Sequence, residues 1–449
     1  MFELTRPARW FLALFFVLYN AFALARVSPL NWTLSENKSH LLGDVDYNVG
    51  RVFAQTRERA AQPFFAVRNH GLYYDRNPAL FMLVSELFIR AGAQSPQPVM
   101  ALMLLLWNVG LWLCFFWQRE LFDSELFAGV GLTFLLTTPF LLFNSTSIQA
   151  DPYGFCFMQL AFFCFARYLK HGLPRAWLIC TCASYFMVCQ GYWMYYAGTF
   201  LMLQAMQLQQ GRFSLRLAAL LALPPVLAFV TTFLQVVYAL GGVHAAIFRL
   251  TDILAARTGD WRVRGSQWNP HWHYLHAGIA ARYPGILGVR ISDIFGYPVV
   301  MYALMIAGTL ALAGREGWAR YRWLPLAILG GVSWNLVMVQ HTVIHKFAAM
   351  YGYFAWMLIV ASFFFEIHRA FRPERGKVAF IALAAPLCVL GLQQYYVPYL
   401  TRYARNIAAG EVVDPASAPA TPAPHHARPR KGSKRPRPLP AADRVAPEG

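Results

Sequence analysis

Residues 217–240, LAALLALPPVLAFVTTFLQVVYAL, form an apolar run that contains no charged side chain. A helix of this length can cross the roughly 30 Å hydrocarbon core of a bilayer, since each residue adds about 1.5 Å. Arg212 and Arg216 precede the run, and basic residues gather at the cytoplasmic ends of membrane helices. The stretch therefore predicts a transmembrane helix, and comparable runs recur along the chain.

The composition of the whole chain agrees with a polytopic membrane protein. Of its 449 residues, 57% are hydrophobic and only 13% are charged, whereas soluble domains carry about 25% charged residues. The net charge of +18 is explained by membrane orientation and does not indicate a nucleic-acid partner. All seven cysteines lie within apolar runs, which favours small core residues over a disulfide framework or a zinc site.

The apolar runs predict an all-α bundle of about eleven transmembrane helices. Residues 79–91 form a shorter apolar segment with Glu86 and Arg90, so we expect an interfacial helix there. For the first run, a signal peptide cleaved after FALA is the alternative to a membrane anchor. Asn108, Gln159 and Asn335 fall in mid-span, where a hydrogen bond to a neighbouring helix would satisfy each. The predicted spans are residues 10–26, 98–117, 127–145, 152–169, 176–190, 193–208, 217–240, 295–314, 323–342, 347–366 and 378–396.

The short loops between these spans predict the orientation. One set, ARYLKHGLPRA, QQGRFSLR, GREGWARYR and HRAFRPERGK, is rich in Arg and Lys. The opposite connections, NSTSIQAD, QGYW and QHTVIH, contain almost none. Because basic loops remain in the cytoplasm, the amino terminus is expected inside and the carboxyl terminus outside. The Arg- and Ala-rich composition fits a bacterial inner membrane.

This topology divides the chain into two parts. Residues 1–407 form the membrane module, with two long external segments, residues 27–78 and 241–294. Residues 408–449 form an external tail that is basic and rich in Pro and Ala, with too few large apolar residues to fold.

Polar residues that could carry chemistry gather on the predicted external face, in four stretches. They are Asp44 and Asp46 in DVDYNVG; Arg68, His70, Tyr73, Tyr74, Asp75 and Arg76 in RNHGLYYDRNPALF; Asp151 in QADPYGF; and His341, His345 and Lys346 in QHTVIHKF. Each stretch has a simpler interpretation. Asp151 could only cap its helix, the Asp pair could belong to a solvated turn, and Lys346 could snorkel to the interface. The convergence of all four on one face favours a catalytic site.

These stretches, in this order, resemble GT-C type membrane glycosyltransferases. They are most similar to the group of protein O-mannosyltransferases and lipid A aminoarabinose transferases, which is glycosyltransferase family 39 and its relatives. DVDYNVG matches the acidic motif of the first external loop, YYDRNPALF the helix-opening signature, QADPYGFCFMQLAFFCFARYL the acid that begins a later span, and HKFAAMYGYFAWML the basic opening of a late span. Two departures are the Asp-Val-Asp pattern in place of Asp-Glu, and Pro78-Ala79 in place of paired prolines.

The resemblance implies a GT-C-like bundle that uses a polyprenyl-phosphate sugar as donor and a glycolipid, glycan or protein as acceptor. Asp46 or Asp44 would be the base, or the ligand of a divalent cation, and Asp151 would be a second acid. Arg76 and Lys346 would contact the donor phosphate. His70, Tyr73, Tyr74 and His345 would line the substrate site. No other cofactor is implied.

Two alternatives remain open at this point. A glycan polymerase or ligase that uses the same lipids would need the same external charges. A flippase or transporter of lipid-linked sugars is disfavoured, because the spans lack mid-span charges and an evident inverted repeat.

Overall fold

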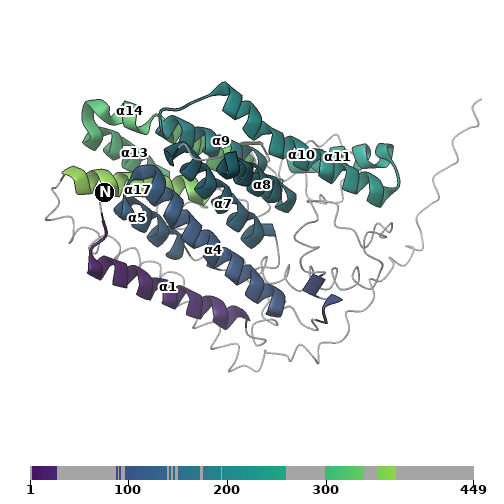
Figure 1. Cartoon of the computed structure of the whole chain (residues 1–449), viewed down its shortest axis with the longest axis horizontal. Helices are drawn as coiled ribbons and strands as arrows, with labels where there is room; N and C mark the ends of the chain where they lie inside the picture. The colour runs from purple at the N-terminus through teal and green to yellow at the C-terminus, as the bar shows by residue number, and fades with distance from the viewer. Residues whose placement is uncertain are drawn as a thin grey trace, which may run out of the picture.

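The computed structural model describes residues 3–27, 87–88, 90–92, 97–138, 141–142, 145–146, 150–171, 175–193, 195–258, 299–337 and 352–370. Within these ranges every regular element is a helix, which confirms the all-α prediction (Figure 1). The α-helices are α1 (Arg6–Val27), α4 (Gln97–Phe122), α5 (Glu125–Leu136), α7 (Ala150–His171), α8 (Arg175–Gly191), α9 (Tyr195–Gln209), α10 (Leu215–Leu240), α11 (Val243–Thr258), α13 (Val299–Ala313), α14 (Gly317–Tyr321), α15 (Leu324–Val337) and α17 (Gly352–Ala370), and η3 (Gly314–Glu316) is a 3₁₀ turn.

Three of these helices are long and apolar enough to cross a membrane. They are α1, α4 and α10, with apolar parts Arg6–Leu24, Gln97–Phe122 and Leu215–Tyr238. Glu125–Leu136 and Leu324–Trp334 are apolar but shorter. These helices are those of a membrane protein. The remaining predicted spans up to 347–366 overlap with described helices, with residues 295–298, 338–342 and 347–351 outside the described ranges, and the span at 378–396 lies wholly outside them.

One prediction needs correction. The predicted span 127–145 is not one helix, because α5 ends at Leu136. Near this end, the hydroxyls of Thr133, Thr137 and Thr138 donate to carbonyls one turn earlier, and such bonds compete with continued helix. The segment 241–294, predicted to be external, begins with a helix, α11, which lacks the length and hydropathy of a membrane span.

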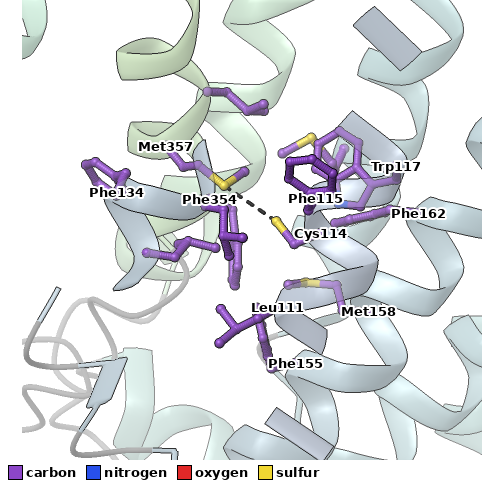
Figure 2. Close-up of a cluster of buried hydrophobic side chains, with 14 of the residues drawn as sticks. Leu111, Cys114, Phe115, Trp117, Phe134, Phe155, Met158, Phe162, Phe354 and Met357 are labelled. Carbon is purple, nitrogen blue, oxygen red and sulfur yellow. Dashed lines mark hydrogen bonds between the residues drawn. The ribbon is translucent and has the colours of Figure 1, made fainter. Parts of the chain in front are cut away.

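The core lies where α4, α5, α7 and α17 cross (Figure 2). Cys114 Sγ of α4 lies 3.6 Å from Met357 Sδ of α17. The rings of Phe155 and Phe354 stack with centroids 5.5 Å apart. Gly110 brings α4 close to α7, because a Cβ there would lie 2.6 Å from the Phe155 ring. Small residues at such crossings let membrane helices pack closely.

Polar side chains in mid-span are joined between helices, as the sequence predicts. Asn108 Nδ2 of α4 donates to Asn20 Oδ1 of α1 at 2.6 Å. Trp117 Nε1 of α4 donates to Gln159 Oε1 of α7 at 2.7 Å. The prediction is confirmed for Asn108 and Gln159, whereas the side chain of Asn335 lies outside the described residues.

The cysteines follow their prediction with one exception. Cys114, Cys156, Cys164 and Cys189 are buried, and Cys182 is half-buried. Cys180 is exposed, because it lies on a face of α8 that no described helix covers. Cys388 lies outside the described residues.

The described basic loops meet at one end of the bundle, which we call the basic end. Arg9 at the start of α1 pairs with Glu125 at the start of α5, with Nη2 and Oε2 2.8 Å apart. Arg320 of α14 pairs with Glu366 near the end of α17 at 2.9 Å. Further contacts at this end join Arg167, Lys170 and His171 of α7 to Glu120 and Asp123.

Basic side chains at this end also cap neighbouring helices. Arg212 Nη1 donates to the carbonyl of Leu169 at 2.6 Å, in the last turn of α7. Arg322 Nε donates to the carbonyl of Leu208 at 3.2 Å, in the last turn of α9. A cation at a helix C-terminus satisfies an unpaired carbonyl and complements the helix dipole. The same arginines that predict the orientation therefore join helices that are not consecutive in the chain.

Candidate functional site

The candidate site lies at the end of the bundle opposite the basic end. There α7 begins, the turn between α8 and α9 lies, and α10 and α15 end. Asp151 is the second residue of α7, as the sequence predicts for an acid that begins a span, and its side chain lies outside the described residues. The other predicted site residues are also outside them: Asp44, Asp46, His70, Tyr73, Tyr74, Arg76, His345 and Lys346.

The first turns of α7 pack closely against the turn between α8 and α9. A Cβ on Gly154 would lie 2.3 Å from Cε2 of Tyr195, and a Cβ on Gly191 would lie 3.0 Å from Cδ1 of Tyr153. Both glycines thus leave room for a tyrosine of the facing element. Tyr153 and Tyr195 are buried, so the helix start that carries Asp151 is held against the start of α9.

Aromatic side chains extend this contact from α7 toward α10 and α15. The ring centroids of Trp193 and Tyr196 are 5.6 Å apart, and those of Trp193 and Phe229 are 6.0 Å apart. Tyr192 and Trp334 are 6.2 Å apart. Rings of Trp and Tyr with one apolar and one polar edge are typical of a membrane–water interface.

Beside this aromatic cluster is a cavity of about 700 Å³. Ligand sites in proteins commonly have volumes of about 300–1,000 Å³. Apart from the hydroxyl groups of Thr251 and Tyr196, its walls are formed by aliphatic, proline and aromatic side chains. The lining residues are Trp193, Tyr196, Pro225, Val226, Phe229, Phe233, Ile247, Leu250, Thr251, Ile253, Leu254 and Trp334.

Two features of α10 shape the wall of this cavity. Pro224 and Pro225 lie inside the helix, and proline removes the N–H groups that would bond to the preceding turn. Pro225 and Val226 line the cavity directly. Gln190 Nε2 of α8 donates to the carbonyl of Ala228 at 3.0 Å, and this bond joins α8 to α10 one turn beyond the prolines.

Sequence reasoning did not find the cavity. The signal that could have indicated it is the stretch QGYWMYY, residues 190–196, which contributes Trp193 and Tyr196 to the wall. Half of the remaining wall comes from α11, which the sequence placed in an external loop.

The described residues at this end can bind an apolar molecule. Among the residues that the structure describes, no group of three or more His, Cys, Asp or Glu could hold a metal ion. The cation ligands expected from the sequence, Asp44 and Asp46, lie outside them. Comparison with protein-family models and with curated proteins finds no match to this chain.

Proposed function

We propose that the protein is a membrane glycosyltransferase that moves a hexose or pentose from a polyprenyl-phosphate donor to an acceptor at the external face of the membrane. The observation that carries the proposal is the apolar cavity beside the helix start that bears Asp151, at the end opposite the basic loops. A site for this reaction needs an apolar chamber for a lipid chain next to acid–base groups, and this end supplies the chamber.

The orientation is supported by the basic end. The loops that carry Arg9, Arg167, Arg212 and Arg320 are joined there by ion pairs and helix caps. A membrane protein keeps such loops in the cytoplasm. The cavity and Asp151 would then face the external side, in a bundle of about eleven spans.

The external location of the proposed site limits which sugar donor it can use. An external site has no access to cytoplasmic nucleotide sugars, so its sugar must cross the membrane on a lipid. Each methylene of a prenyl chain buried in the cavity contributes about 0.8 kcal/mol of binding free energy. Trp193, Phe229 and Leu254 provide the apolar surface that this requires.

The reaction is a direct displacement with inversion at the anomeric carbon. Asp46 or Asp44 removes the proton from the acceptor hydroxyl or amine, and the acceptor atom bonds to the anomeric carbon. The bond from that carbon to the phosphate oxygen breaks, and polyprenyl phosphate leaves with the electron pair. Arg76 and Lys346 stabilise the phosphate, and Asp151 acts as the second acid. In the alternative role, Asp44 and Asp46 would hold a divalent cation that stabilises the departing phosphate, and loss of activity on chelation by EDTA would distinguish this role from that of a base.

The test compares two carboxylates at opposite ends of the bundle. Asp151→Asn should lower transfer from a radiolabelled polyprenyl-phosphate sugar by at least about a hundredfold in proteoliposomes, since acid–base groups contribute about 10²–10⁴-fold. Asp123→Asn, at the basic end, is the matched control and should transfer at the wild-type rate. Equal rates for both variants contradict the proposal.

The lipid product separates the proposal from its alternatives. A transferase with a monophosphate donor releases polyprenyl phosphate, whereas a polymerase or ligase releases polyprenyl diphosphate. Movement of intact lipid-linked sugar across the bilayer without product would indicate a flippase.

A further inference from the structure

Helix α11 presents large apolar side chains outward. Val243, Ile247 and Leu254 are each more than half exposed, and Phe248 is 68% exposed. His244 and Thr251 are exposed polar residues among them, and Ala246 and Ile253, which lie on an adjacent side of the helix, are buried. Full burial of one such large side chain is worth about 1.5–3 kcal/mol. Covering the four exposed apolar side chains of this outward face with an apolar phase would therefore stabilise the helix.

The outward face of α11 continues a lipid-facing surface. Along α10, Val226, Leu227, Leu234 and Tyr238 are each more than half exposed, and α10 is one of the helices that can cross a membrane. Gly241 caps α10 in the left-handed conformation with φ 78°. The chain turns there and begins α11 at Val243, so no polar segment separates the two surfaces (Figure 1).

The cavity lies between these two helices. Val226 and Phe229 of α10 form one wall, and Ile247, Leu250 and Leu254 of α11 form another. Ile247 and Leu254 both line the cavity and belong to the outward face. The side of the cavity that α11 forms is therefore part of the same apolar surface.

We propose that α11 lies in the membrane leaflet at the end opposite the basic loops, with its outward apolar face covered by lipid acyl chains. An apolar helix face in such a position is buried about 5–10 Å into the boundary between headgroups and acyl chains. The cavity then opens sideways into this leaflet, and a single-chain or prenyl lipid reaches it without crossing water. The placement of α11 follows from its outward apolar face and does not depend on glycosyl transfer.

The experiment measures the depth of nitroxide labels in the full-length protein in phosphatidylcholine–phosphatidylglycerol nanodiscs. Cys180, Cys182 and Cys388 are replaced by serine, and the four buried thiols are retained. Single labels are placed at Phe248→Cys and, as a second reporter of the same face, at Val243→Cys. Leu227→Cys in mid-α10 is the deep reference, and Glu316→Cys at the basic end is the aqueous reference.

Collision with oxygen, which enters lipid, and with a nickel chelate, which remains in water, gives the depth. Labels at 248 and 243 should lie about 5–10 Å below the headgroups, shallower than the label at 227. Access of nickel at 248 equal to that at 316 would show a face in water and overturn the proposal. Protection of both α11 labels from both reagents would show a covering protein and would also overturn it. The readout uses no substrate, so failure here leaves the transfer test of the proposed function intact.

Discussion

Replacing Gly154 by alanine tests whether the contact between α7 and α9 positions the candidate site. A Cβ at this position would lie 2.3 Å from Cε2, 2.6 Å from Cζ and 2.9 Å from the hydroxyl oxygen of Tyr195. Carbon atoms in contact are about 3.5–4.0 Å apart, so the ring or the helix must move by roughly 1 Å. Tyr195 is buried, and its displacement disturbs the neighbouring side chains. Overpacking of this kind costs about 1–3 kcal/mol.

We therefore expect Gly154→Ala to lower the free energy of unfolding by about 1–3 kcal/mol. Transfer activity should also fall, because Asp151 lies on the turn that moves. The matched control is Gly242→Ala, since nothing lies within 4 Å of a Cβ there, and its effect should remain within about 0.5 kcal/mol. Unfolding is followed by circular dichroism during titration with dodecyl sulfate in mixed micelles.

Combining Gly154→Ala with a substitution of Tyr195 identifies the cause of the destabilisation. In Tyr195→Ala the ring is absent, so Gly154→Ala should no longer destabilise the protein. In Tyr195→Phe the destabilisation should persist, because Cε2 and Cζ, the closest atoms, remain. If Gly154→Ala is as stable as Gly242→Ala, or if its effect is unchanged in Tyr195→Ala, this contact does not hold α7 against α9.

Two further predictions concern polar groups. Asn108→Leu should destabilise the protein by about 0.6–1.7 kcal/mol through loss of the hydrogen bond to Asn20, and no change in the same titration would show that this bond is dispensable. Burial, followed by the charge and hydrogen bond of Glu366, raises the pKa of Tyr321, and Arg320 opposes the shift. The folded chain then retains this proton to higher pH than the unfolded chain, so the contribution of Tyr321 to stability is constant below about pH 10 and falls above it. In Tyr321→Phe this alkaline decline should be smaller, and an identical decline from pH 8 to 11 refutes the assignment.

The sequence by itself determined the long apolar helices and their order. An apolar run without charge can satisfy its backbone in a bilayer only as a helix, so α10, predicted at 217–240, is observed at Leu215–Leu240. The alternation of basic loops also depends on local composition alone, and the structure brings Arg9, Arg212 and Arg320 to one end. The start of α7, predicted at 152 and observed at Ala150, was predictable because Pro152 suits a first helical turn.

The candidate site is predictable only in part. The motif QADPYGF predicts that an acid lies at the start of α7, but it does not predict which side chains of other helices lie beside it. Tyr195 faces Gly154 because two helices distant in sequence cross at that point, and no periodicity within either helix indicates its partner. The most informative sequence signal, the aromatic stretch at residues 190–196, indicates an interface without indicating a cavity.

Tertiary structure alone decided which apolar residues pack together and which face outward. Asn108 could have bonded to any neighbouring helix, and its partner Asn20 was set by the packing of α1 on α4. Helix α11 was missed because it lacks the length and hydropathy of a membrane span, and a loop is the default interpretation of such a segment. Its apolar residues have a physical meaning only beside α10, because Ile247 and Leu254 complete the cavity and belong to the outward apolar surface that continues from α10.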